Sequence, residues 1–494
     1  MVNNYHYSKE ISPNKPLVLH YAPANGLFGD PIPFYWQGQY HLFFQNSPDE
    51  LSFNNMRWAH IVSKDLIHWE SLPEALIPEI GQPDEFGCWT GSVIHHHNQF
   101  HIFYTGHNKT ADGRNQTICH AISSDLISWK KDENNPILVP QTPFSVLEDA
   151  AWRDPFIYQD DDEFRMILTA ELPGVPALLK GCIGEFRSKD LIHWQDASVL
   201  YAPLESQKLE CPDLFRLQEN WYLLYSDYGV QIRRSNNGRN LWKSLSPSYL
   251  DKFPFYAGKT LIDDKNRRIC FGFISNRMEE LDSSLWNWGG VLGLPRKLEI
   301  SENGDLIVTP IEEISQLKKE RIPINISEGS FNCPKNPVIN EGMDFRFLKN
   351  GTTLVGFGQH PYTWELDFSL IEIEQKRISL LFACEQNLQS GYRIEFDPSH
   401  CMISLNRLDA VRLGDPLVLQ SISVPHSLWK NPSVKIIFDY SVVELFFQDR
   451  IVFSSRIYDL NPENNWWGFY SQDGEIHLSN LNAWNLDLLD ERVK

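Results

Sequence analysis

A seven-residue segment, Ser-Lys-Asp-Leu-Ile-His-Trp, occurs twice in this chain, at residues 63–69 and 188–194, with a near copy at 123–129. The three copies start 60 and 65 residues apart, and a weaker copy at 235–242 starts 47 residues later. A repeat of about this period that ends in tryptophan is typical of a β-propeller, in which each repeat forms one blade. Because the first strand of every blade lies at one central axis, residues far apart in the sequence can meet there in a single pocket.

Each repeat is organised as a strand, a turn and a second alternating strand. Such units begin near Asp30, Gly91, Asp154, Asp213 and Ala257. We therefore predict a five-bladed propeller over residues 1–310. The repeated blocks themselves are interpreted as structural, because their Ser and Asp side chains can bond the backbone amides of their own turn and their Trp can fill the space between blades.

The pattern changes after the propeller. A charged segment at 311–330 is predicted to be a linker with one or two helical turns. From 331 to 494, short alternating strands such as 434–439 continue without the 60-residue signature, which indicates an antiparallel β-sandwich. The predicted fold is therefore all-β, with an N-terminal propeller and a C-terminal sandwich.

Charge and composition narrow the possible partners. The 494 residues carry a formal net charge of −20, which argues against binding to nucleic acid. No stretch approaches the ~20 apolar residues of a membrane span, and the first residues lack the apolar region of a secretory signal, so we expect a cytoplasmic protein. The 8 cysteines show no paired metal spacing, and the run His95 to His97 is interpreted as a polar turn. Neither a metal nor a cofactor is predicted.

Three acidic residues lie where innermost strands are predicted to begin: Asp30, Asp154 and Glu210, in the first, third and fourth blades. Each has a proline within two residues, which suits a strand entry where no ladder amide is needed. Taken singly, each could be an ordinary turn carboxylate. Three carboxylates in matching register would repel one another and would be costly to desolvate. Such a set is therefore retained mainly when it takes part in catalysis.

Glycoside cleavage is the chemistry that best fits three carboxyl groups in one pocket. A sugar acetal needs a proton on the leaving oxygen and a nucleophile or base on the other face of the anomeric carbon. Proximity of like charges and partial burial keep one carboxyl protonated at neutral pH. Arg153, beside Asp154, could hold that acid ionised.

Several segments resemble glycoside hydrolase family 32, whose members include invertases, sucrose-6-phosphate hydrolases, inulinases and levanases. They are Arg-Asp-Pro at 153–155, Glu-Cys-Pro-Asp-Leu-Phe at 210–215, and the segments 40–45, 58–69, 87–92, 288–296 and 438–446. The resemblance covers nearly the whole chain in order. It implies a propeller with a C-terminal sandwich and the hydrolysis of β-fructofuranosides.

The resemblance also implies roles for individual residues. Asp30 would be the nucleophile that forms a covalent fructosyl intermediate, Glu210 the general acid and then base, and Asp154 the residue that binds sugar hydroxyls and stabilises the transition state. Net retention would follow. Residues that match sugar-binding positions of the family are Gln45, Trp58, Trp89, Thr90, Arg153 and Tyr256.

The chain departs from the family pattern around Asp30. The usual block reads Trp-x-Asn-Asp-Pro-Asn-Gly, whereas this chain has Gly29 before Asp30 and Ile32-Pro33 after Pro31. Gly29 lacks the donor and acceptor of the asparagine. The mechanism survives the change, but the substrate is left open among sucrose, sucrose-6-phosphate, a fructan and an unusual fructoside.

Alternatives remain open at this point. A fructosyltransferase would use the same intermediate and pass the sugar to another sugar. A non-catalytic carbohydrate-binding propeller or an inverting arabinan-type hydrolase is also possible, although the three acids and the Glu-Cys-Pro-Asp block argue against each in turn. The expected partner is a small sugar, with neither nucleic acid nor membrane, and the sandwich could mediate a homodimer.

Overall fold

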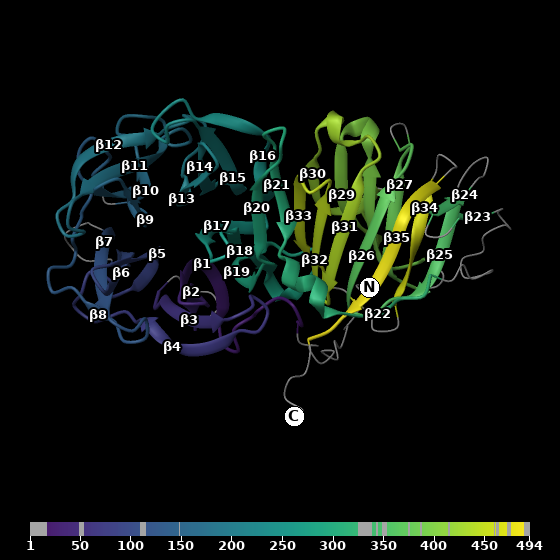
Figure 1. The fold of residues 1–494 in the computed structure, drawn as a ribbon, viewed down its shortest axis with the longest axis horizontal. Coiled ribbons are helices and arrows are strands. Elements are labelled where there is room, and N and C mark those ends of the chain that lie inside the picture. Colours follow the sequence, from purple (N-terminus) through teal and green to yellow (C-terminus); the bar gives the residue numbers. More distant parts are fainter. Residues whose placement is uncertain are drawn as a thin grey trace, which may run out of the picture.

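The computed structural model describes residues 17–48, 54–108, 115–147, 149–324, 338–341, 344–347, 353–373, 376–385, 388–412, 415–458, 460, 464–471 and 476–488. Within these ranges the regular structure consists of strands and four short 3-10 helices, which confirms the predicted all-β fold. None of the helices described is long and apolar enough to cross a membrane. Figure 1 shows a ring of strand units beside a layered body of long strands.

Strand pairing divides β1 to β21 into five consecutive antiparallel units. The first comprises β1 (Leu27–Trp36), β2 (Gln39–Ser47), β3 (Arg57–Ser63) and β4 (Glu70–Leu76). The second comprises β5 (Gly87–His96), β6 (Gln99–His107), β7 (Gln116–Ser123) and β8 (Lys130–Lys131). The third comprises β9 (Arg153–Asp160), β10 (Glu163–Glu171), β11 (Gly181–Ser188) and β12 (Gln195–Tyr201). The fourth comprises β13 (Glu210–Leu217), β14 (Asn220–Ser226), β15 (Gly229–Ser235) and β16 (Lys243–Lys252). The fifth comprises β17 (Phe255–Ile262), β18 (Arg268–Arg277), β19 (Trp286–Leu292), β20 (Arg296–Ile300) and β21 (Leu306–Pro310), with the 3-10 helix η1 (Met278–Glu280) after β18.

The first strands of the five units form a closed ring. β1 packs against β5, β5 against β9, β9 against β13, β13 against β17, and β17 against β1 (Figure 1). The fifth unit is also joined to the first by antiparallel pairing of β19 with β1, where Gly290 faces Phe28. These contacts confirm the propeller predicted from the sequence repeat.

The repeated blocks form hydrogen-bonded turns, as expected. In the first copy, Ser63 Oγ accepts a hydrogen bond from the amide of Leu66 at 2.8 Å, and Asp65 Oδ1 accepts from the amide of Ile67 at 2.9 Å. The same bonds recur in the copies at 123–129 and 188–194. Trp129 of the second unit packs edge-on against Phe43 of the first, with ring centroids 6.0 Å apart. The blocks are therefore structural, and they lie after the third strand.

Beyond the propeller, η2 (Glu312–Leu317) supplies the helical turn predicted for the linker, and β22 (Lys318–Arg321) then pairs with β35. One sandwich sheet contains β33 (Ile451–Arg456), β32 (Val442–Phe447), β31 (Ser433–Asp439), β26 (Thr363–Leu370), β35 (Ile476–Leu486), β24 (Asp344–Phe347) and β23 (Val338–Glu341). The other contains β25 (Thr353–Gln359), β34 (Trp466–Ser471), β27 (Ile378–Cys384), β28 (Tyr392–Asp397), β29 (Met402–Arg412) and β30 (Asp415–Ser423). Helices η3 (Pro398–His400) and η4 (His426–Leu428) lie in connections of this domain. Buried aromatic and aliphatic side chains of both sheets form one core, which accounts for the alternating pattern of the sequence.

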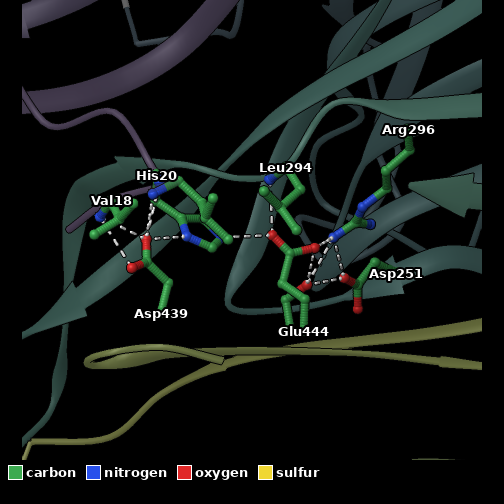
Figure 2. Close-up of polar contacts among 9 residues, drawn as sticks. Val18, His20, Asp251, Leu294, Arg296, Asp439 and Glu444 are labelled. Carbon is green, nitrogen blue, oxygen red and sulfur yellow. Dashed lines mark hydrogen bonds and ion pairs between the residues drawn. The ribbon is translucent and has the colours of Figure 1, made fainter. Parts of the chain in front are cut away.

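A buried polar network joins the propeller to the sandwich (Figure 2). Nη2 of Arg296 lies 2.9 Å from Asp251 Oδ2, 2.8 Å from Glu444 Oε2 and 2.6 Å from Ser454 Oγ. Asp251 and Arg296 belong to the propeller, whereas Glu444 and Ser454 belong to the sandwich. The side chains of Arg296, Asp251 and Glu444 are fully buried, so these charges depend on one another rather than on water.

The same network fixes the segment that precedes β1. His20 Nδ1 lies 2.9 Å from Asp439 Oδ2, and His20 Nε2 lies 3.1 Å from Glu444 Oε1. Asp439 also accepts hydrogen bonds from the backbone amides of residues 18, 19 and 20 (Figure 2). Burial works against a charged imidazole, but the hydrogen bonds and charges of Asp439 and Glu444 outweigh it and raise the pKa of His20. His20 thus ties the segment before β1 to the carboxylates of the sandwich sheet.

We predict that Arg296→Met lowers the free energy of unfolding by about 3–5 kcal/mol, because it leaves Asp251 and Glu444 buried without their cation. Urea unfolding followed by circular dichroism measures the effect. Lys297→Met is the matched control, since Lys297 pairs with the exposed Glu299 and Glu312 and should cost no more than about 1 kcal/mol. Equal losses in both variants would contradict a special role for the network.

Candidate active site

The three predicted acids line one pocket at the propeller axis. Asp30 is the fourth residue of β1, Asp154 the second of β9 and Glu210 the first of β13. The pocket has a volume of about 360 Å³. Its other lining residues are Gln45, Met56, Trp89, Gln116, Arg153, Lys208, Cys211, Tyr256 and Trp288. Acids from three separate units thus meet at one end of the ring.

A β-bulge lies at Asp30 and Asp154 and directly after Glu210, and it breaks the regular alternation of each strand. In β1, Gly29 and Asp30 together face the single residue Gln45, between the pairs Phe28–Asn46 and Pro31–Phe44. Corresponding register shifts occur in the other four innermost strands, at Thr90, at Asp154–Pro155, at Cys211–Pro212 and at Ala257–Gly258. A bulge bends its strand and re-aims a side chain, and proline is tolerated there because no ladder amide is required. The prolines beside the acids therefore mark bulges near the strand entries.

Arg153 holds Glu210 in place. Its Nη2 donates to Glu210 Oε1 at 2.5 Å and its Nη1 donates to Gln116 Oε1 at 3.0 Å. The hydroxyl of Tyr256 donates to Glu210 Oε2 at 2.6 Å. Burial favours the neutral carboxyl, but the charge of Arg153 and the two hydrogen bonds outweigh it and lower the pKa of Glu210. The side chain is 28 % exposed, so it can reach a molecule in the pocket.

Asp154 is the most enclosed of the three acids. Its Oδ2 accepts hydrogen bonds from the amide of Cys211 at 2.9 Å and from Thr169 Oγ1 at 3.4 Å. Its own amide donates to Thr105 Oγ1 at 2.9 Å, and its backbone φ of +60° is the left-handed conformation of the bulge. Burial raises the pKa of Asp154, while the charge of Arg153 opposes this. The bonds fix the carboxylate as a rigid acceptor.

The pKa of Asp30 is raised by its surroundings. Burial, with the charges of Asp154 and Glu210, raises the pKa of Asp30 to about 7, against the opposing charge of Lys259. With the Gln45 amide nitrogen facing Asp30, Gln45 Nε2 donates to Asp30 Oδ2 at 3.1 Å. Asp30 therefore tends to hold a proton in the free pocket at mildly acidic pH, whereas the lowered pKa of Glu210 favours its ionised form.

The residues predicted to bind sugar fall into two groups. Gln45, Trp89, Arg153 and Tyr256 line the pocket together with the acids. Trp58 and Thr90 lie behind it and are fully buried. Trp58 Nε1 donates to the carbonyl of Trp89 at 2.9 Å, and the Thr90 amide donates to Gln45 Oε1 at 2.6 Å. These two residues therefore support pocket residues rather than face the cavity.

Five lining residues were not singled out from the sequence: Met56, Gln116, Lys208, Cys211 and Trp288. Cys211 and Trp288 belong to segments already recognised, and their position in the bulge and at the start of β19 could have been inferred. Gln116 begins a third strand and Met56 precedes one, so no local pattern marks them. In the part of the chain that the structure describes, no group of three or more His, Cys, Asp or Glu side chains could hold a metal ion.

Family models match both halves of the chain. Residues 20–310 match the "Glycosyl hydrolases family 32 N-terminal domain" and residues 344–485 match "Glycosyl hydrolases family 32 C terminal". The chain belongs to glycoside hydrolase family 32. It is accordingly a glycoside hydrolase, as the resemblance of its motifs implied.

Individual relatives agree with this assignment. A sucrose-6-phosphate hydrolase of Escherichia coli is 27 % identical over 95 % of this chain and 94 % of its own length. An insoluble β-fructofuranosidase isoenzyme of Oryza sativa subsp. indica is 30 % identical over 62 % of this chain and 56 % of its own. The crystal structure of fructan 1-exohydrolase IIa from Cichorium intybus has the same fold, with a TM-score of 0.74 at 20 % identity, covering 97 % of this chain and 98 % of that one.

Proposed function

We propose that this glycoside hydrolase cleaves β-fructofuranosidic bonds with retention, through a covalent fructosyl-enzyme intermediate. The observation that carries the proposal is the convergence of Asp30, Asp154 and Glu210 in one pocket, with Arg153 and Tyr256 bonded to Glu210. The named relatives, which are sucrose-6-phosphate hydrolases and β-fructofuranosidases, support the same substrate class.

The geometry suggests how the two chemical steps proceed. Asp30 attacks the anomeric carbon while Glu210 gives its proton to the glycosidic oxygen, so that a carbon–carboxylate bond forms as the carbon–oxygen bond breaks. In the second step Glu210 takes a proton from water, the water oxygen attacks the same carbon, and Asp30 is released. Asp154, fixed by hydrogen bonds from the Cys211 amide and the Thr169 hydroxyl, accepts from sugar hydroxyls and stabilises the positive charge that develops on the ring.

The proton must change place before the first step. In the free pocket the pKa of Asp30 lies near 7 and that of Glu210 lies below its ordinary value, so the single proton is mostly on Asp30. Catalysis requires the same proton on Glu210. The two arrangements differ only in which of the two carboxyls carries the proton, so the ratio of their populations does not depend on pH. Activity therefore follows the fraction of enzyme in which Asp30 and Glu210 together hold one proton.

We therefore predict a bell-shaped dependence of kcat/KM on pH, with its maximum below pH 7. Above about pH 7 the pair loses its only proton and kcat/KM should fall about tenfold per pH unit; below the lowered pKa of Glu210 both groups are protonated and Asp30 cannot attack. Initial rates at low substrate concentration from pH 4 to pH 9, with enzyme shown to survive each buffer, provide the test. A kcat/KM that still rises above pH 7 would contradict this proton assignment.

We predict that Asp30→Asn and Glu210→Gln each lower kcat by about 10²–10⁴-fold, because each removes a group that forms a bond or transfers the proton. Asp160→Asn is the matched control, since Asp160 ends β9 at the opposite end of the strand from Asp154. Its activity should stay within about twofold of the parent. Full activity of either pocket variant would remove that residue from its proposed role.

Lys208 supports a phosphorylated fructoside among the possible substrates. It lines the pocket two residues before Glu210, and its backbone is held by bonds of Ser206 Oγ to its carbonyl and amide at 2.9 and 3.3 Å. Among the described residues, its ammonium has no hydrogen-bond or ion-pair partner, whereas Arg153 is already paired with Glu210. An otherwise acidic pocket thus offers one available cation to an anionic group on the leaving sugar.

We predict that sucrose-6-phosphate is cleaved with a higher kcat/KM than sucrose, and that Lys208→Met removes about tenfold or more of this preference. The effect on sucrose itself should be small. Lys180→Met is the control, because Lys180 is bonded to Glu171 at 2.7 Å. Product analysis at high sucrose in the same assays distinguishes hydrolysis from transfer. An unchanged ratio in Lys208→Met would rule out its role in phosphate binding.

Three sequence-based expectations stay predictions: the domain limits 1–310, 311–330 and 331–494, a cytoplasmic location, and a homodimer formed through the sandwich. Size-exclusion chromatography with light scattering would test the dimer directly. Activity should not depend on it, since every pocket residue comes from the propeller of one chain.

A further inference from the structure

The strand that joins the fifth unit to the first comes unusually close to its neighbours. A Cβ atom at Gly290 would lie 2.0 Å from the carbonyl oxygen of Ile274, and real Cβ contacts essentially never fall below 3.0 Å. β19 can therefore pair with both β18 and β1 at this point only because residue 290 has no side chain. This close pairing fixes where Trp288, two residues earlier, meets β1.

The indole of Trp288 occupies the space that a side chain at residue 29 would need. A Cβ atom at Gly29 would lie 2.2 Å from Cζ2 and 2.3 Å from Cη2 of Trp288. Both atoms belong to the six-membered ring of the indole. Any other amino acid at position 29 would therefore force Trp288 out of its place. The ring also packs against Phe273, with centroids 6.1 Å apart, which limits its freedom to move.

The same indole is part of the pocket wall. Trp288 is half-buried and lines the cavity together with Asp30, which directly follows Gly29. The face of an aromatic ring is apolar and carries partial negative charge, so it attracts the C–H groups of a sugar ring rather than its hydroxyls. An amide side chain at residue 29, as in the usual family block, would instead present a hydrogen-bond donor and acceptor.

We infer that Gly29 and Trp288 act as one recognition element. The indole forms an apolar wall for the C–H face of the sugar beside Asp30, and the absence of a side chain at Gly29 leaves room for the indole. The departure from the family block at residue 29 thus removes a polar side chain and leaves room for the indole at this place. This inference rests on the proposed function, because the sugar concerned is the fructosyl group that Asp30 attacks.

A double-mutant cycle tests whether the two residues act together. Gly29→Ala adds the Cβ that meets the indole, and Trp288→Phe removes Cζ2 and Cη2 while keeping an aromatic ring. For each single variant and the double variant, the Kd for fructose is measured by calorimetry and kcat/KM with the best fructoside, alongside Tm as a check on folding. Trp286→Ala is the matched control, because Trp286 lies on β19 but stacks on Arg277 outside the pocket.

Gly29→Ala should weaken fructose binding and lower kcat/KM by about tenfold or more in the parent, but by less than about twofold in the Trp288→Phe background. In the Trp286→Ala background the full loss should persist. If Gly29→Ala fails to fold while the double variant folds and binds fructose, the same coupling is demonstrated.

Independent, multiplicative effects of Gly29→Ala and Trp288→Phe would overturn the inference while leaving fructoside cleavage intact. Unchanged fructose affinity in Trp288→Phe together with a harmless Gly29→Ala would overturn it as well. A parent enzyme that neither binds fructose nor cleaves any fructoside would instead refute the proposed function, and the recognition element with it.

Discussion

The innermost strands of the five units form a closed ring, which determines where the pocket residues meet. Because β1, β5, β9, β13 and β17 pack in a circle, residues at equivalent positions of each strand meet at one end of the axis. A bulge at the same level in all five strands then turns side chains into that space. The pocket is thus a consequence of ring closure and repeated bulges, and the outer strands serve to hold the ring.

Concentrating three carboxyl groups in such a ring has an electrostatic cost, which neighbouring groups offset unequally. Arg153 and Tyr256 favour the ionised form of Glu210, whereas Asp30 is left with a pKa near 7. The unequal environments push the two pKa values apart, which is how carboxyl groups of one type come to serve different roles. A distinct set of buried charges around Arg296 joins the propeller to the sandwich and lies in the core rather than at the pocket.

The sequence predicted the features that depend on residues close together in the chain. The repeated turn, the prolines beside the acids and the alternating strands led to the propeller, the sandwich and the three pocket acids. Contacts between residues of different units leave no such local pattern and could not be predicted. Trp58 and Thr90 matched pocket positions yet lie behind Trp89 and Gln45, while Gln116 and Lys208 carry no local signal. Gly29 was interpreted as a lost polar group, because the indole that fills its place comes from a strand 259 residues away.

The proposed mechanism requires Asp30 and Glu210 to face the same anomeric carbon from opposite sides. The most direct measurement is to trap the intermediate: Glu210→Ala is incubated with a fructoside that has an activated leaving group, and the protein is digested and analysed by mass spectrometry. We expect one added fructosyl group on the peptide that contains Asp30. A fructosyl adduct on any other acid, or rapid turnover to an inverted sugar without an adduct, would contradict it.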